Sequence, residues 1–338
     1  MTGRPTPQEH PPTVGAPLTG TSVWAVAQRA FATQRSGRYV PDSVQHPARM
    51  APDLAAHIIR TYTRPGDLVV DPMCGIGTTL VEAVHAGRLA LGLDCEKRWV
   101  AIAEHNLDLA GRQGAQTRGD VVHADARTLP EELVAQAGTA ALILTSPPYG
   151  PNNHYHNRIR STRETGQRGL MHRRDAYGDP DDEANLANVT PQAMAVGFTE
   201  ILRASAPLLR GDGYLVVTAR PWRENGELVD LPSMVIQAAE AAGFTHIDRN
   251  VALLTGLRSD RLIPRPSFLQ LTQLRQAWTK GARPHLIAHE DVLVFLAAGL
   301  QVFRHGSGPV EILESAPPGD NYHSTPLLSE QFRGEHHE

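Results

Sequence analysis

The sequence has few cysteines and no long hydrophobic run, and both absences restrict what the protein can be. Its two cysteines, Cys74 and Cys95, are too few for a disulfide framework or a thiolate metal site, and they fit a reducing compartment. No run of about 18 apolar residues occurs, and the N-terminus lacks the basic and then apolar pattern of a signal peptide. We therefore expect a soluble, cytoplasmic protein without a membrane segment.

The sequence also has no excess of positive charge. The chain has 32 Lys and Arg residues against 36 Asp and Glu, which gives a formal net charge of -4, and only Lys97 and Lys280 are lysines. This balance excludes a global cationic field that would attract a polyanion. Any contact with nucleic acid must therefore come from a local cluster of basic side chains.

The 338 residues are enough for one large α/β domain with elaborations. Both ends are polar and rich in proline, so we expect a disordered arm over residues 1–22 and a C-terminal extension and tail over 301–338. Between them, over residues 23–300, short runs of Val, Ile and Leu alternate with helical segments. That alternation is typical of a Rossmann-like α/β fold, here a seven-stranded, mostly parallel sheet with helices on both faces.

Seven segments have the composition of buried strands. They are residues 67–71, 89–94, 121–123, 141–145, 213–218, 245–254 and 291–296. Residues 150–189 and 257–289 do not follow the pattern, and long irregular inserts in a domain of this kind are usually lids or binding loops.

A glycine turn follows the first of these strands. Gly75 and Gly77 give the backbone the freedom to make a tight turn and let a ligand approach it closely. Thr78 or Thr79 is placed to cap the helix that we expect over residues 78–86. The turn has no lysine of the kind that binds phosphates in nucleoside triphosphatases, so the pattern favours a dinucleotide or S-adenosylmethionine.

Three acids stand at the carboxyl ends of successive predicted strands, where such a sheet binds its ligands. Asp94 is placed to accept hydrogen bonds from two ribose hydroxyls, Asp125 from an adenine amino group, and Asp71 lies near the charged amino-acid part of the cofactor. Cys74 is interpreted as a small filler of the turn and not as a nucleophile. The predicted cofactor site consists of His46, Pro47, Asp71, Pro72, Cys74, Gly75, Gly77, Thr78, Thr79, Asp94 and Asp125.

The fourth predicted strand is followed by Ser146, Pro147, Pro148 and Tyr149. Two successive prolines fix the backbone and remove two amide donors. The Ser146 hydroxyl and the Pro147 carbonyl can accept the hydrogens of an amino group, and Tyr149 can stack on the base that carries it. The segment therefore predicts a catalytic site for an amino group on a flipped base.

The segments 71–79 (DPMCGIGTT) and 146–149 (SPPY) resemble the cofactor-loop and catalytic motifs of amino-methylating DNA methyltransferases, which act on cytosine N4 or adenine N6. Residues 46–50 (HPARM) are similar to the segment that closes over the methionine end of the cofactor in that family. The resemblance implies S-adenosylmethionine as cofactor and nucleic acid as partner. A serine before the two prolines is commoner in the cytosine-N4 enzymes, so DNA cytosine N4 is the favoured substrate.

Four alternatives stay open. The same motifs resemble enzymes that methylate guanosine N2 of transfer RNA, although few residues precede His46 and we expect no separate RNA-binding domain there. A DNA adenine-N6 enzyme, a non-catalytic relative that only binds nucleic acid or cofactor, and a methyltransferase for a small molecule or a protein glutamine are the others.

Basic residues cluster directly after Tyr149, with a single acid, Glu164, among them. Arginines beside a base-flipping pocket would contact phosphates, so we predict that this cluster binds nucleic acid. Arg258 to Arg265 form a second candidate, and the histidines of the first cluster lack the companions of a metal site. The first cluster consists of Arg158, Arg160, Arg163, Arg168, Arg173 and Arg174.

Overall fold

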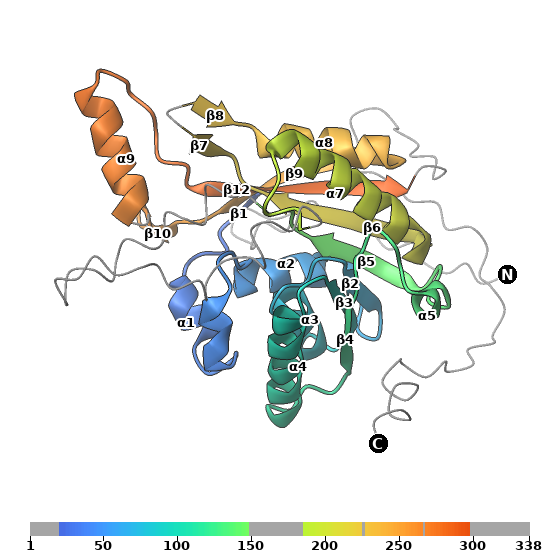
Figure 1. The fold of residues 1–338 in the computed structure, drawn as a ribbon. Helices are drawn as coiled ribbons and strands as arrows, with labels where there is room; N and C mark the ends of the chain where they lie inside the picture. Colours follow the sequence, from blue (N-terminus) through green and yellow to red (C-terminus); the bar gives the residue numbers. More distant parts are fainter. Residues whose placement is uncertain (1–19, 149–184, 225–226, 266–267, 298–338) are drawn as a thin grey trace, which may run out of the picture.

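Runs of aliphatic residues form a central sheet in the computed structural model, which describes residues 20–148, 185–224, 227–265 and 268–297 (Figure 1). In this part of the chain the sheet has eight strands in the order β1-β9-β12-β6-β5-β2-β3-β4. Strand β12 runs antiparallel to both of its neighbours, and the other pairs are parallel. The strands are β1 (Val23–Trp24), β2 (Leu68–Asp71), β3 (Leu89–Asp94), β4 (Gly119–His123), β5 (Ala140–Thr145), β6 (Leu209–Ala219), β9 (Phe244–Leu253) and β12 (His289–Ala297).

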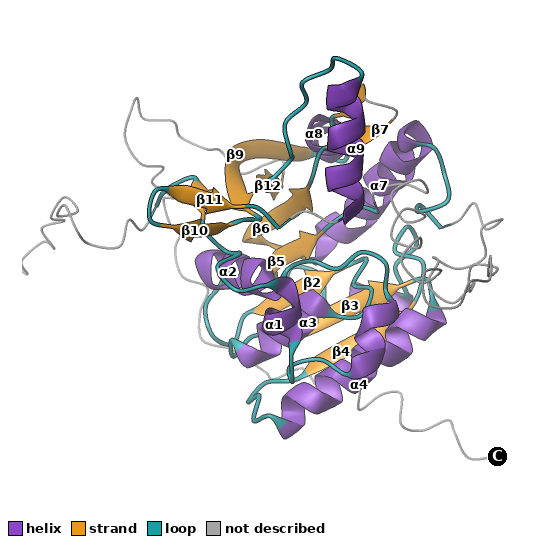
Figure 2. Ribbon diagram, turned by 90° about the vertical axis from the view of Figure 1, so that its left-hand side faces the viewer, coloured by secondary structure: helices purple, strands orange, loops and turns teal. Residues whose placement is uncertain are grey.

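Helices cover both faces of the sheet (Figures 1 and 2). Successive strand residues enter opposite cores, so that Val69 packs in one cluster with Ile58 while Val70 packs in the other with Phe198. This two-sided burial explains the continuous aliphatic runs and confirms the predicted α/β class. Helices α2 (Pro52–Tyr62), α3 (Thr78–His85) and α4 (Lys97–Arg112) cover one face, and α7 (Pro191–Ser205) and α8 (Leu231–Ala241) cover the other. None of the described helices is both long and apolar enough to pass through a membrane.

The order of the strands reverses beside β2. The chain passes from β2 outward to β3 and β4, and then returns to place β5 on the other side of β2, where Val70 pairs with Ile143. In an open α/β sheet, ligands bind at such a reversal, beyond the carboxyl ends of the strands. The glycine turn after β2 and the proline segment after β5 therefore emerge side by side.

The structure departs from the predicted elements at the edges. The sheet gains an eighth strand, the two-residue β1, in which Val23 pairs with Val251. The insert predicted as irregular over 257–289 contains a hairpin and a helix, and a further hairpin was not predicted. Their strands are too short and too exposed to show the buried pattern on which strand prediction depends. These elements are β10 (Gly256–Arg258), β11 (Arg261–Ile263), α9 (Phe268–Thr279), β7 (Trp222–Glu224) and β8 (Glu227–Val229).

Candidate cofactor and substrate pocket

A cavity of about 850 Å³ lies at the carboxyl ends of the parallel strands and brings most of the predicted site together. Gly77 is the one predicted site residue of the described part that does not line it. Tyr149, the arginine cluster that follows it, and the histidines weighed as metal ligands lie outside the described residues. The predicted residues that line the cavity are His46, Pro47, Asp71, Pro72, Cys74, Gly75, Thr78, Thr79, Asp94, Asp125, Ser146, Pro147 and Pro148.

Both glycines of the turn adopt left-handed backbone conformations, with φ of 53° at Gly75 and 76° at Gly77. A side chain at Gly75 would also collide with His46, because a Cβ there would lie 2.8 Å from Nε2 of that ring. A Cβ at Gly77 would lie 3.1 Å from Cβ of Ala103 on α4. The absence of a side chain at Gly75 therefore leaves room for the His46 ring at the cavity wall. The absence of one at Gly77 lets the turn pack against α4.

The expectation that Thr78 or Thr79 caps helix α3 is wrong. The helix begins at Thr78 with Gly77 in the capping position, and no side chain caps it. Both threonines lie inside the first turn, so their hydroxyls are used elsewhere. Thr79 Oγ1 donates to Asp71 Oδ2 at 2.7 Å, and Thr78 Oγ1 accepts from Arg35 Nη2 at 3.2 Å.

Asp71 ends β2 and is almost fully buried beneath the turn. Its carboxylate accepts hydrogen bonds from the Thr79 hydroxyl and, at 3.1 Å, from the Met73 amide. Burial raises the pKa of Asp71 to about 6, which these hydrogen bonds oppose. Asp71 thus fixes the shape of the turn from below.

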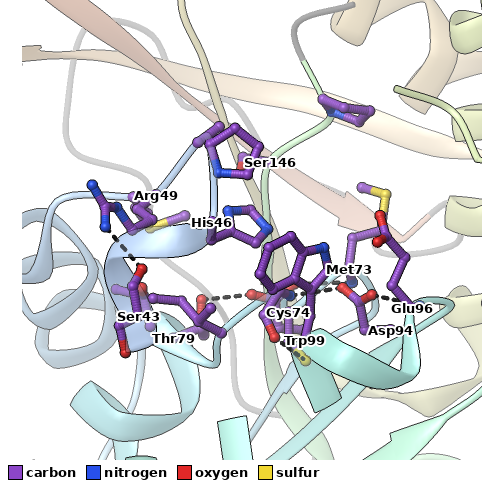
Figure 3. A pocket seen from close by; sticks show the side chains of 18 of the residues that line it. Ser43, His46, Arg49, Met73, Cys74, Thr79, Asp94, Glu96, Trp99 and Ser146 are labelled. Atoms are coloured by element: carbon purple, nitrogen blue, oxygen red, sulfur yellow. Dashed lines mark hydrogen bonds between the residues drawn. The ribbon is translucent and has the colours of Figure 1, made fainter. Parts of the chain in front are cut away.

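Asp94 ends β3 and connects that strand to the turn (Figure 3). Its Oδ2 accepts from the Gly75 amide at 2.8 Å, and its Oδ1 accepts from the Glu96 amide at 2.9 Å. Burial raises the pKa of Asp94 to about 7. A carboxylate has about four acceptor positions, so two positions remain for ligand hydroxyls after the two amides are counted.

Asp125 follows β4 and forms an ion pair that the sequence analysis did not foresee. Arg127 donates from Nε to both carboxylate oxygens at 3.0 Å and from Nη2 to Oδ2, and its backbone amide donates to Oδ1. Although burial acts in the opposite direction, the hydrogen bonds from Arg127 lower the pKa of Asp125. Asp125 is therefore held as an acceptor at the edge of the cavity, and its contact with adenine stays a prediction.

His46 and Cys74 line the cavity, His46 against Trp99 of α4 and Cys74 against β3. The His46 ring is buried and meets the ring of Trp99 edge-on, with 4.6 Å between their centroids (Figure 3). Arg98 lies over the Trp99 ring at 4.0 Å. Cys74 is buried, and burial raises the pKa of its thiol well above the usual value, so the thiol stays protonated and acts as a filler.

Two lining residues that carry no motif present buried hydrogen-bond donors. Arg35 Nη1 and Trp99 Nε1 have no hydrogen-bond partner among the described residues, and both side chains line the cavity. Burial lowers the pKa of Arg35 to about 10, so its guanidinium stays charged at neutral pH, and it stacks on Tyr39 at 4.7 Å. Donors of this kind suit a ligand with a carboxylate or other acceptor oxygens.

Arg35 belongs to a segment that covers the turn and includes α1 (Phe31–Arg35) and the short 3-10 helix η1 (Pro41–Gln45). The segment is anchored to α3 by the buried Glu82, which accepts from the Tyr39 hydroxyl at 2.7 Å and from the Arg38 guanidinium. It is anchored to α4 by Asn106, whose amide oxygen accepts from the Val40 backbone at 2.8 Å. These long-range bonds hold the cover in place.

The other half of the cavity lies beyond β5 and contains residues that sequence reasoning missed. Arg220 follows β6, Leu254 follows β9, and Glu290 is buried near the start of β12. Because β12 is antiparallel, its first residues reach the edge at which the parallel strands end. Arg220 donates from Nη2 to the Ile287 carbonyl at 3.0 Å. The pocket therefore has a half formed around β2, β3 and β4 and a half formed around β6, β9 and β12, with Ser146 between them.

Comparisons with known proteins find similarity to methyltransferases of DNA and of transfer RNA. Residues 17–105 match the model of a DNA methylase family (N6_N4_Mtase). A tRNA (guanine(10)-N2)-dimethyltransferase of Methanothermobacter thermautotrophicus is 34% identical over 106 residues, which are 31% of this chain and 29% of that protein. The type II methyltransferase M2.DpnII of Streptococcus pneumoniae is 39% identical over 64 residues, or 19% of this chain and 24% of that protein.

The DNA adenine methyltransferase YhdJ of Escherichia coli is 31% identical over 80 residues, which cover 23% of this chain and 27% of that protein. The chain thus matches less than a third of the length of these relatives. Among solved structures, TrmN from Thermus thermophilus matches with a TM-score of 0.43 and 16% identity, over 78% of this chain and 53% of that one. The sequence matches confirm the resemblance predicted from the motifs, which is to amino-methylating DNA methyltransferases and to transfer-RNA guanine-N2 methyltransferases.

Proposed function

We propose that the protein is an S-adenosylmethionine-dependent methyltransferase that acts on an exocyclic amino group of a nucleic-acid base. One observation carries the proposal: the glycine turn after β2 and the proline segment after β5 line the same cavity at the reversal of the sheet. The first has the features of a nucleoside site, and the second presents acceptors for an amino group. A cavity of about 850 Å³ is also within the range of small-molecule sites.

The lining residues suit the parts of this cofactor. Asp94 has acceptor positions for the ribose hydroxyls, and Asp125 lies next along the sheet for the adenine amino group. Arg35 presents a buried, charged donor for the carboxylate of the amino-acid part. When bound, S-adenosylmethionine supplies an electrophilic methyl group on a sulfonium centre.

The proline segment prepares the amino nitrogen of the substrate. The Ser146 hydroxyl and the Pro147 carbonyl accept the two amino hydrogens, which keeps the lone pair on nitrogen available for the methyl group. Prolines at positions 147 and 148 hold these acceptors in place because their backbone torsions are restricted. Tyr149 stacks on the base once it has left the helical stack.

DNA cytosine N4 is the substrate that we favour, because a serine precedes the two prolines. The second candidate is guanine N2 in transfer or ribosomal RNA, supported by the match of 106 residues to a protein named as a tRNA guanine-N2 dimethyltransferase. Adenine N6 in DNA is the third, supported by the match to a protein named as a DNA adenine methyltransferase.

Nucleoside analysis of DNA and RNA from cells with and without the gene tests these candidates. Loss of N4-methylcytosine from DNA supports the first choice, whereas loss of a methylated guanosine from RNA overturns it in favour of the second. If no methylated nucleoside changes and the purified protein does not bind S-adenosylhomocysteine, the proposed function is wrong.

A further inference from the structure

A basic surface projects from the fold next to the half of the cavity that is formed around β6, β9 and β12, which we call the substrate half. We define it as the arm, which consists of the described residues 256–265 and 268–288 and includes β10, β11 and α9. The arm has six cationic side chains and one acid, Asp260, within a chain whose net charge is -4. All six cations are exposed, and they are Arg258, Arg261, Arg265, Arg275, Lys280 and Arg283.

The arm also exposes apolar side chains that globular proteins usually cover. Leu262 and Trp278 are each about half exposed, at 54% and 51%. Arg283 lies over the Trp278 ring, with 5.4 Å between its Cζ and the ring centroid. Basic side chains interleaved with exposed aromatic and aliphatic groups are typical of a surface that contacts both the phosphates and the bases of nucleic acid.

The base of the arm is fixed to the cavity. The hairpin begins two residues after Leu254, and the arm ends directly before β12, which carries Glu290. At the returning end, Ile287 accepts the hydrogen bond from Arg220. A nucleic acid on the arm would therefore lie within reach of the pocket that receives its base.

A second set of contacts fixes the hairpin. Gln28 accepts from the Leu257 amide through Oε1 and from Arg265 Nη2 through its backbone carbonyl, both at 2.9 Å. From this base, α9 stands clear of the two helical layers, on the side of the molecule where α1 lies (Figures 1 and 2). The arm is thus an outward extension of the substrate half of the pocket.

We propose that the arm is the docking surface for double-stranded DNA, and this inference rests on the proposed function. The major groove of B-form DNA is about 12 Å wide and admits an α-helix or a two-stranded ribbon, and the arm presents one of each. The major groove of A-form RNA is too narrow for side chains to read. The exposed arginines supply phosphate contacts around either element.

Fluorescence anisotropy of the full chain with a labelled 30-base-pair DNA duplex tests the inference across a series of salt concentrations. The test variant carries Arg258→Gln, Arg275→Gln and Lys280→Gln. The matched control carries Arg60→Gln, Arg64→Gln and Arg112→Gln. These three arginines are exposed and lie near the ends of α2 and α4, before β2 and β4 begin and away from the carboxyl ends that form the cavity. Binding of S-adenosylhomocysteine by calorimetry and the mass in solution by light scattering are measured for every protein.

The arm variant should bind the duplex at least about tenfold more weakly near physiological salt. Its slope of log K against log salt should fall in magnitude by up to about 2.7, because each lost phosphate contact removes about 0.9. The control should stay within about twofold of wild type, and both variants should bind S-adenosylhomocysteine as wild type does.

Three outcomes overturn the inference. In the first, the arm variant and the control lose equal affinity for the duplex. In the second, the arm variant binds a labelled RNA hairpin more weakly than wild type does but binds the duplex equally well. In the third, the arm variant differs from wild type only in its mass in solution. These outcomes are separable from failure of the proposed function. If the wild-type protein binds DNA through the arm but transfers no methyl group to any nucleic acid, the proposed function is refuted. If the protein methylates DNA and the arm substitutions leave its affinity for DNA unchanged, only the docking inference is refuted.

Discussion

Replacing Gly75 by alanine should damage the proposed cofactor site through two effects that can be worked out from the structure. Two separate effects follow from the added methyl group. The first is backbone strain, because φ is 53° at this position and a residue with a Cβ is disfavoured there by roughly 1 kcal/mol. The second is a collision with His46, whose Nε2 atom would lie 2.8 Å from the new carbon.

The energetic cost of the collision can be estimated from the packing contact that the His46 ring would lose. Its ring is buried and packs edge-on against Trp99, and an aromatic contact of this geometry is worth about 0.5–1.5 kcal/mol. Gly75→Ala should therefore lower the free energy of unfolding by about 2 kcal/mol in total. The displaced ring and the methyl group should also intrude on the cavity and weaken binding of S-adenosylhomocysteine.

Gly87→Ala is the matched control. Gly87 has φ of 78°, and a Cβ there would meet nothing closer than Pro65 Cβ at 3.9 Å. The Gly87→Ala variant should lose only about 1 kcal/mol of unfolding free energy, from backbone strain, and should bind S-adenosylhomocysteine as wild type does. Urea unfolding and calorimetry measure both quantities, and in a His46→Ala background the two glycine substitutions should become equally costly. Equal losses of stability and affinity for the two variants in the wild-type background would refute the reasoning.

The remaining predictions concern single side chains of the proposed site. Burial raises the pKa of Asp94 from 3.8 to about 7, so the native state holds a proton that the unfolded state has lost, and stability should fall as pH rises from 4 to 7. Asp94→Asn should remove this part of the pH dependence of urea unfolding, and unchanged curves would contradict the assignment. Arg35→Gln should weaken S-adenosylhomocysteine binding by about tenfold or more. It should leave the affinity for 5′-methylthioadenosine unchanged, because that ligand lacks the carboxylate. Equal losses of affinity for the two ligands would show that Arg35 does not contact the carboxylate. Tyr149→Ala should reduce turnover far more than cofactor affinity, whereas a matching loss of both would argue against stacking on the base.

The sheet could be predicted because a strand that is buried on both faces appears in the sequence as a continuous run of aliphatic residues. Strands such as β2 and β5 have buried residues throughout, and a run of this kind is recognisable without knowing its partner. The exposed hairpin β10–β11 has no such run, and neither does the two-residue β1, whose pairing with Val251 depends on the whole fold.

The same distinction explains which site residues were found. Asp71 and Asp94 end recognisable strands and Ser146 directly follows one, so their positions follow from local sequence. Arg35 reaches the cavity only because Glu82 and Asn106 anchor the segment around it, which requires partners more than 40 residues away. The reversed direction of β12 brings Glu290 to the ligand edge from the start of a strand, where a rule based on strand ends does not look.

The two halves of the pocket also differ in what relatives can reveal about them. The family match covers residues 17–105, which supply the glycine turn, Asp71 and Asp94, and so concerns the half around β2, β3 and β4, to which we assign the cofactor. Ser146, Arg220 and Glu290 all lie beyond it. Enzymes that use one cofactor on different bases need to share only the first half, because discrimination between bases depends on groups that meet the base itself. Under the proposed function, we therefore expect the choice between cytosine, guanine and adenine to depend on the residues around β5, β6 and β12. Substitutions there should change which base is accepted before they change the affinity for the cofactor.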